Sequence, residues 1–233
     1  WVAVRGAFAI VGALNHVRAR GTIWSAAVGV ELLARATGFF TPRLGRSTTA
    51  DWTIAGSHFA ERCQAFVLTA LGESSVVIGS TLSEIKNVKS ADAGAFVAAF
   101  VGAVALWWVY FDRSAEAGAQ EIEHSTDPGR LGRSAYHLIH PIMVAGIIVT
   151  AAADKRVLAA PTGTTEVATA WLVLGGTALF LAGHAAFKAT VWHVVPWTRL
   201  VAIAIVGLLG LVATSISALA LAAITAAIVV GLA

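Results

Sequence analysis

Long apolar stretches recur along almost the whole sequence, and they constrain the fold of this chain more than any other feature. A helix needs about 20 predominantly apolar residues to cross the ~30 Å hydrocarbon core of a bilayer. Charged residues make up 12% of the 233 residues, against about 25% in a soluble domain. The chain therefore lacks the polar surface of a water-soluble fold, and we predict an integral membrane protein.

The sequence predicts an all-α fold, a polytopic transmembrane helix bundle of seven or eight spans that forms a single integral-membrane domain over residues 1–233. Alternation with a period of two residues is nowhere sustained, which disfavours a membrane β-barrel. Polar segments separate the spans, and we interpret the longest of them, 113–130, as a linker. The expected spans are 1–17, 22–40, 57–82, 93–112, 131–153, 166–188, 198–213 and 216–233.

Both ends of the chain lie in apolar runs. The tail 198–233 is too long for one span of a ~30 Å core and rather short for two. We expect it to break at Thr-Ser-Ile-Ser, residues 214–217, into two short helices, with one long tilted helix as the alternative. The chain begins with Trp1 and its only methionine is Met143, so we expect further residues, with one or more spans, before Trp1.

Charge and cysteine content narrow the function classes. The formal net charge is only +3 and sits in the loops, so it bears on membrane orientation and does not indicate nucleic-acid binding. The single cysteine, Cys63, rules out an intrachain disulfide. No nucleotide-binding loop or haem ligand pair is evident, so we expect no cofactor and no primary pump. The expected partners are the lipid bilayer and a small ion or solute.

The expected span 57–82 carries ionisable residues, which are costly inside a membrane and usually face the protein interior or a water-filled path. Arg62, Thr69 and Glu73 fall on one helical stripe, and His58 lies one turn before Arg62. We interpret the stripe as part of a polar path for a proton, an ion or a polar solute. In the alternative, His58 and Arg62 lie at the interface and Glu73 is a buried, paired or protonated structural group.

Histidines supply further candidate residues for this path. His137 and His140 are three residues apart and share a helix face, and His184 lies one turn deeper in its span than Lys188. Imidazoles are suitable proton relays because their pKa is close to neutral. Two histidines do not make a metal site, so we expect no metal. Pro141 follows His140 directly and is expected to kink the helix and free a carbonyl.

Other patterns in the spans have structural interpretations. Glu31 and Arg35 are four residues apart, which predicts an intrahelical ion pair that lowers the cost of insertion. The small residues from Gly175 and Gly176 to Gly183 are typical of close helix packing.

Several short motifs, in order over about residues 40–200, resemble the bacterial low temperature requirement protein A (LtrA) family. These motifs are Arg46-Ser47-Thr48-Thr49-Ala50-Asp51-Trp52-Thr53, His58-Phe59-Ala60-Glu61-Arg62, Ala70-Leu71-Gly72-Glu73-Ser74, Ala105-Leu106-Trp107-Trp108-Val109-Tyr110-Phe111-Asp112, Asp127-Pro128-Gly129-Arg130, Arg133-Ser134-Ala135-Tyr136, His140-Pro141-Ile142-Met143-Val144-Ala145-Gly146-Ile147 and Gly183-His184-Ala185-Ala186-Phe187-Lys188.

The resemblance implies a multi-pass protein of the bacterial inner (plasma) membrane. The family usually opens with further spans that carry a Glu-Leu-Phe-Phe-Asp-Leu type motif, so the resemblance implies that this chain is the C-terminal part of a longer family protein. The family name reflects growth in the cold, and no biochemical activity is firmly attached to it.

Three functions are compatible with the sequence. The leading hypothesis is a proton- or ion-coupled transporter or permease, with Glu73, His137, His140 and His184 bordering a polar path. The second is an intramembrane lipid-modifying enzyme with a histidine and a carboxylate as acid and base, although we lean towards no enzymatic activity. The third is a non-catalytic sensory or structural membrane protein linked to cold growth, in which buried polar groups only fix helix packing. Convergence of the ionisable groups on an aqueous cavity would favour the first.

Overall fold

The computed structural model describes residues 1–15, 17–43, 45, 56–112 and 114–233. These residues form helices joined by short connections, which confirms the all-α class. In chain order the elements are α1 (Val2–Leu14), α2 (Val17–Ala36), α3 (Gly56–Ser83), α4 (Ser90–Phe111), α5 (Ser114–His124), α6 (Pro128–Leu131), the π-helix η2 (Gly132–Ile139), α7 (His140–Ala159), α8 (Val167–Trp192), α9 (Trp197–Leu209), the 3₁₀-helix η3 (Ala213–Ser215) and α10 (Ala218–Val230).

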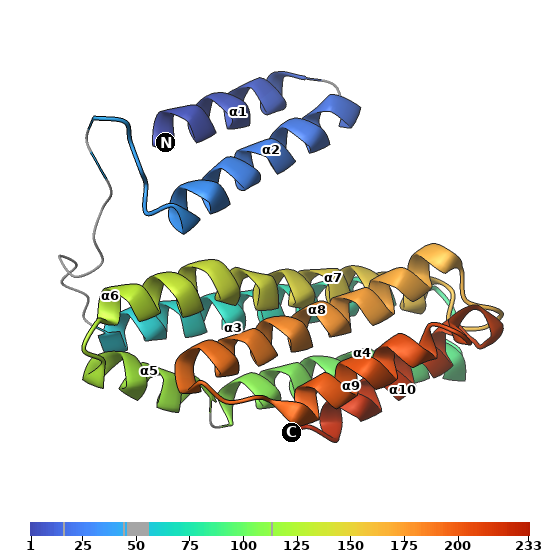
Figure 1. Ribbon diagram of the computed structural model, residues 1–233. Coiled ribbons are helices and arrows are strands. Elements are labelled where there is room, and N and C mark those ends of the chain that lie inside the picture. Colours follow the sequence, from blue (N-terminus) through green and yellow to red (C-terminus); the bar gives the residue numbers. More distant parts are fainter. Residues whose placement is uncertain (16, 44, 46–55, 113) are drawn as a thin grey trace.

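Most of the helices pack side by side in one bundle (Figure 1). Helix α7 packs along α8, α10 packs along α4, and α3 packs against α7, while α9 lies on α8. The hairpin formed by α1 and α2 lies to one side of this bundle. Buried apolar side chains form two clusters within the bundle, and the candidate site described below lies between them.

In the described part of the chain, four helical stretches are long and apolar enough to cross a membrane. They contain α3, α4, α6 to α7, and α8. Helices α1, α9 and α10 are apolar but have 13 residues each, about 20 Å at ~1.5 Å per residue. The chain therefore has the helices of a multi-pass membrane protein, and the number of seven or eight spans stays a prediction.

The segment before α7 shows how a proline shapes this bundle. Pro141 has no N–H and can donate to neither the Tyr136 nor the His137 carbonyl, and the helix is a π-helix over the preceding turns. Nη1 of Arg35, on α2, donates to the His137 carbonyl oxygen at 3.2 Å. The same guanidinium forms an ion pair with Glu31 at 2.9 Å. The Glu31–Arg35 pair thus exists, and its arginine also ties the α1–α2 hairpin to the bundle.

Helix α5 lies within 113–130, which we interpreted as a linker. Its apolar residues recur at helical spacing, so that Ala115 and Ile122, seven residues apart, share one face. Both are buried against the bundle, and the side chain of Gln64 donates to the Ala115 carbonyl at 3.2 Å. The polar composition of this segment concealed a short amphipathic helix.

The tail turns at η3, within the region where the sequence analysis placed the break. Thr165 donates to the Ile216 carbonyl through both its amide, at 3.0 Å, and its hydroxyl, at 2.8 Å. The Leu219 amide donates to the Pro161 carbonyl at 3.1 Å, and the Ser217 hydroxyl caps the first turn of α10. These bonds attach the start of α10 to the α7–α8 loop and so fix α10 in position against α4.

Candidate functional site

Glycines bring the backbones of α7 and α8 close together. A Cβ atom on Gly146 would lie 2.5 Å from the backbone nitrogen of Phe180, and one on Gly176 would lie 2.8 Å from a backbone nitrogen of α7. Gly183 is equally close to α7, whereas a Cβ on Gly175 would meet open space. Close packing, which the sequence predicted for this region, therefore depends on Gly146, Gly176 and Gly183.

One polar group beside the contact is a buried pair of Tyr110 and His140. Tyr110 Oη lies 3.1 Å from His140 Nε2, and both residues are almost fully buried. The Tyr136 ring stacks on His140 with centroids 6.2 Å apart, and its hydroxyl has no hydrogen-bond partner among the described residues. The pair is satisfied internally, so its first role is to fix the positions of α4 and α7.

We expect Tyr110→Phe to destabilise the protein by about 1–3 kcal/mol, because it leaves a buried ring nitrogen of His140 without its partner. Tyr136→Phe is the matched control, since it removes a buried hydroxyl that bonds to nothing described, and its effect is expected to be neutral or stabilising. Unfolding in mixed micelles with increasing SDS measures both changes. Equal losses in the two variants would contradict the importance of the Tyr110–His140 bond.

His184 is the most deeply buried of the described histidines, with no exposed surface. Its ring stacks on that of Phe180, one turn earlier in α8, with centroids 6.2 Å apart. The histidine therefore faces the interior of the bundle. It lies in the same half of the bundle as Tyr110 and His140.

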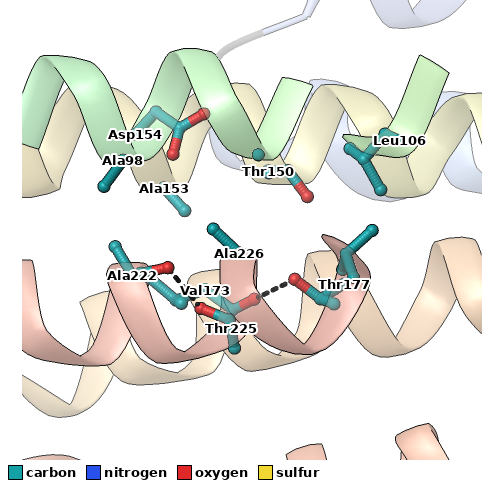
Figure 2. Close-up of a pocket in the computed structure, with 12 residues that line it drawn as sticks. Ala98, Leu106, Thr150, Ala153, Asp154, Val173, Thr177, Ala222, Thr225 and Ala226 are labelled. Atoms are coloured by element: carbon teal, nitrogen blue, oxygen red, sulfur yellow. Dashed lines mark hydrogen bonds between the residues drawn. The ribbon is translucent and has the colours of Figure 1, made fainter. Parts of the chain in front are cut away.

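A small cavity of about 30 Å³ lies where four helices meet, on the other side of the core (Figure 2). Asp154 is its charged residue; the side chain comes from α7 and the residue is only 7% exposed. The hydroxyl residues in the lining are Thr150 on α7, Thr177 on α8 and Thr225 on α10. Helix α4 contributes apolar lining residues, among them Gly102 and Leu106. Among the described residues, none forms a hydrogen bond or ion pair with the Asp154 carboxylate.

The three threonines present acceptors to this cavity. A threonine hydroxyl has one donor hydrogen and two acceptor lone pairs, and each of these hydroxyls donates to a carbonyl one turn earlier in its own helix. The bonds run from Thr150 to Gly146 at 3.0 Å, from Thr177 to Val173 at 3.0 Å and from Thr225 to Leu221 at 2.6 Å. The remaining capacity of the hydroxyls, like that of the carboxylate, is to accept.

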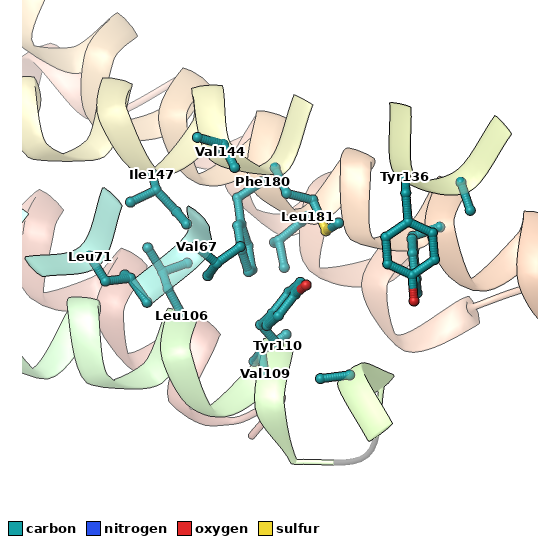
Figure 3. Packing of buried hydrophobic residues seen from close by; sticks show 14 of the residues in the cluster. Val67, Leu71, Leu106, Val109, Tyr110, Tyr136, Val144, Ile147, Phe180 and Leu181 are labelled. Atoms are coloured by element: carbon teal, nitrogen blue, oxygen red, sulfur yellow. The ribbon is translucent and has the colours of Figure 1, made fainter. Parts of the chain in front are cut away.

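An apolar layer separates this cavity from the Tyr110–His140 pair. Leu106 lies one turn before Tyr110 on α4, and Ile147 and Phe180 lie between the two polar groups on α7 and α8. Ile147 and Phe180 are fully buried and Leu106 nearly so, and Figure 3 shows them packed together in the core. Buried apolar side chains therefore separate the Asp154 cavity from the Tyr110–His140 pair.

The residues that the sequence predicted for one polar path lie in separate parts of the structure. His58, Arg62, Thr69 and Glu73 lie on the exposed face of α3, where His58 Nδ1 is 3.4 Å from Glu61 Oε2. The structure keeps these four apart from the buried histidines.

The remaining predicted residues lie in or near the core. His137 is half-buried, and its ring meets that of Phe59 edge to face at 5.1 Å. His140 and His184 are buried in one half of the bundle. A groove of about 450 Å³ between α3 and α7 contains Thr69 and Glu73, with Lys155 on the opposite wall.

Asp154 was not among the residues predicted from the sequence, where Asp154, Lys155 and Arg156 indicated the charged end of a span. In the structure α7 continues to Ala159 and turns Asp154 inward, while Lys155 and Arg156 are exposed. The available signal was Thr150, one turn before Asp154 and on the same helix face. In the described part of the chain no group of three His, Cys, Asp or Glu side chains is arranged to hold a metal ion. The motif at 46–53 lies outside the described residues.

These features define the class: a multi-pass helical membrane protein with buried polar groups between its helices. A family model described as "Bacterial low temperature requirement A protein (LtrA)" matches residues 1–233. The chain belongs to this family, as its motifs predicted.

The chain is also similar to part of a longer bacterial protein. A relative from Rhizobium meliloti (strain 1021), described as "Uncharacterized protein RA0937", is 31% identical over 208 residues. These residues are 88% of this chain and 50% of the relative, so the chain spans about half the length of the curated relative that it matches. No solved structure matches the chain.

Proposed function

We propose that this protein is a permease of the bacterial inner membrane that moves protons or small cations through polar groups inside its helix bundle. One observation carries the proposal: the buried Asp154 carboxylate faces a cavity between four helices and has no protein partner among the described residues. Ionisable side chains inside membrane helices are costly, and they commonly mark ion pathways.

The arrangement of the polar groups also supports transport. One group surrounds Asp154 and the other contains His140 and His184. The apolar layer of Leu106, Ile147 and Phe180, here called the Phe180 layer, lies between them. Transporters commonly bind their substrate between helices and open towards each side of the membrane in turn. In such a mechanism the Phe180 layer is the barrier that rearranges.

The other two functions receive less support. A lipid-modifying enzyme needs an acid and a base at one place, but Asp154 and His140 are 14 residues apart on α7, about 21 Å along the axis. A purely structural role accounts for the satisfied Tyr110–His140 pair. It accounts for Asp154 only when the carboxyl group is protonated, because a charged carboxylate that only fixes packing requires a partner.

We expect Asp154→Asn to abolish ion flux in proteoliposomes that contain a pH-sensitive dye and are exposed to Na⁺ or proton gradients. The substitution removes the charge and preserves the shape of the side chain. Glu84→Gln is the control, since Glu84 is exposed at the end of α3, and it is expected to leave flux unchanged.

Glu73→Gln tests the candidate carboxylate that the sequence favoured. Loss of flux in Glu73→Gln, with full flux in Asp154→Asn, would move the path to the exposed face of α3. Absence of flux in the unaltered protein across all gradients would overturn the proposed transport function.

A further inference from the structure

The Asp154 carboxylate requires positive charge that the described residues do not supply. Burying a charged group without a partner carries a large energetic cost. The nearest cationic residues in sequence, Lys155 and Arg156, are exposed, and Arg156 lies 3.7 Å from Glu166 at the surface. A proton on the carboxylate or a cation in the cavity that it faces (Figure 2) can supply this charge.

The oxygen atoms that line the cavity favour a positively charged ligand. The hydroxyl hydrogens of Thr150, Thr177 and Thr225 are engaged within their own helices, so the side-chain oxygens offer lone pairs. A cation satisfies several lone pairs at once, and carboxylate and hydroxyl oxygens are hard ligands suited to hard cations. The volume of about 30 Å³ accommodates one or two particles the size of a water molecule, so a cation enters without most of its hydration shell.

The charge of the site limits the ion to a monovalent one. Asp154 is the acidic residue in the lining, and the described residues contain no cluster of metal-binding side chains. Calcium takes 6–8 oxygen ligands, typically with several carboxylates, and magnesium retains several waters. A single carboxylate balances a single positive charge.

We propose that the Asp154 cavity binds one small monovalent cation of the Na⁺ class, with the Asp154 carboxylate and the hydroxyl oxygens of Thr150, Thr177 and Thr225 as its ligands. The proposal rests on the proposed permease function, because it names the ion that the permease carries. Binding joins α7, α8 and α10 through a shared ligand. The ion therefore stabilises the folded bundle as well as neutralising the carboxylate.

The test is the thermal unfolding midpoint of the detergent-solubilised protein in NaCl and in choline chloride at equal ionic strength. A ligand that binds only the folded state raises this midpoint in proportion to the logarithm of its concentration once the site is saturated. We expect Na⁺ to raise the midpoint and choline not to do so. Asp154→Asn is expected to abolish the Na⁺-dependent shift.

Threonine variants keep the proposal testable if Asp154→Asn fails to fold. Thr177→Val and Thr225→Val retain the carboxylate and the approximate shape, and each is expected to weaken Na⁺ binding about tenfold, as loss of one contact to a charged group does. Thr81→Val is the matched control, because the buried Thr81 hydroxyl makes the same bond, at 2.8 Å to the Val77 carbonyl, away from the cavity. It is expected to keep the full shift.

The outcomes separate this proposal from the proposed function. A Na⁺-dependent shift that the Asp154 and threonine variants lose, without flux in proteoliposomes, supports the site and overturns transport. Proton flux without any Na⁺-dependent shift supports transport and overturns the site, which then holds water. A shift of equal size in Asp154→Asn, Thr177→Val and the unaltered protein also overturns the site, because Na⁺ then acts elsewhere.

Discussion

Gly146→Ala is expected to destabilise the bundle by about 3 kcal/mol, at the upper end of the usual cost of overpacking. The added Cβ would lie 2.5 Å from the backbone nitrogen of Phe180 and 2.7 Å from its Cα. Because these are backbone atoms, no change of side-chain rotamer relieves the clash, and α7 and α8 must move apart. The same movement disturbs the cavity, since Thr150 and Asp154 lie on α7 opposite Thr177 on α8.

Gly175→Ala is the control for this prediction. Gly175 is also in α8, but a Cβ there would meet nothing within 4 Å, and alanine is the better helix former by about 1 kcal/mol. Unfolding in mixed micelles with increasing SDS measures both free energies. A similar stability for the two variants would show that the α7–α8 contact is more compliant than its geometry indicates.

The sequence was sufficient for the class of fold because the apolar stretches are long and the charges are concentrated between them. In hydrocarbon a chain must satisfy its backbone hydrogen bonds internally, so such stretches form helices whatever surrounds them. The Glu31–Arg35 pair was equally predictable, because both residues lie on one helix and a spacing of four residues places their side chains next to each other. The freed carbonyl beside Pro141 follows from the missing N–H alone.

The candidate site was less predictable because it depends on which helix faces meet. Helical spacing places Arg62, Thr69 and Glu73 on one stripe, but it does not reveal that the bundle buries the opposite face of α3. Asp154 was obscured by its exposed neighbours Lys155 and Arg156, whose charges indicated the end of a span.

The sequence also does not reveal which helices meet α7 at the cavity. Thr225 is more than 70 residues from Asp154 in the sequence, and they line one cavity because the α9–α10 turn is attached to the α7–α8 loop. Residues that act alone or within one helix are recognisable from sequence. Residues that act through packing require the structure.

Phe180→Ala is expected to have the largest combined effect on stability and function. Phe180 has no exposed surface, and truncating such a side chain to alanine typically costs about 3–5 kcal/mol. The substitution also removes the ring that lies between Thr177, in the cavity lining, and His184. If this ring is the barrier between the two polar groups, its loss lets water and ions pass from one group to the other.

We therefore expect Phe180→Ala to raise passive cation flux in proteoliposomes above that of the unaltered protein, and Phe180→Ala with Asp154→Asn to lose the increase. Leu179→Ala is the matched control, because Leu179 precedes Phe180 but is 36% exposed, so its truncation costs less and leaves the barrier in place. Stability measured in SDS micelles establishes that each variant is folded before flux is compared. A folded Phe180→Ala protein with unchanged flux would exclude the Phe180 ring as the barrier, because a path blocked by one ring must conduct when that ring is removed.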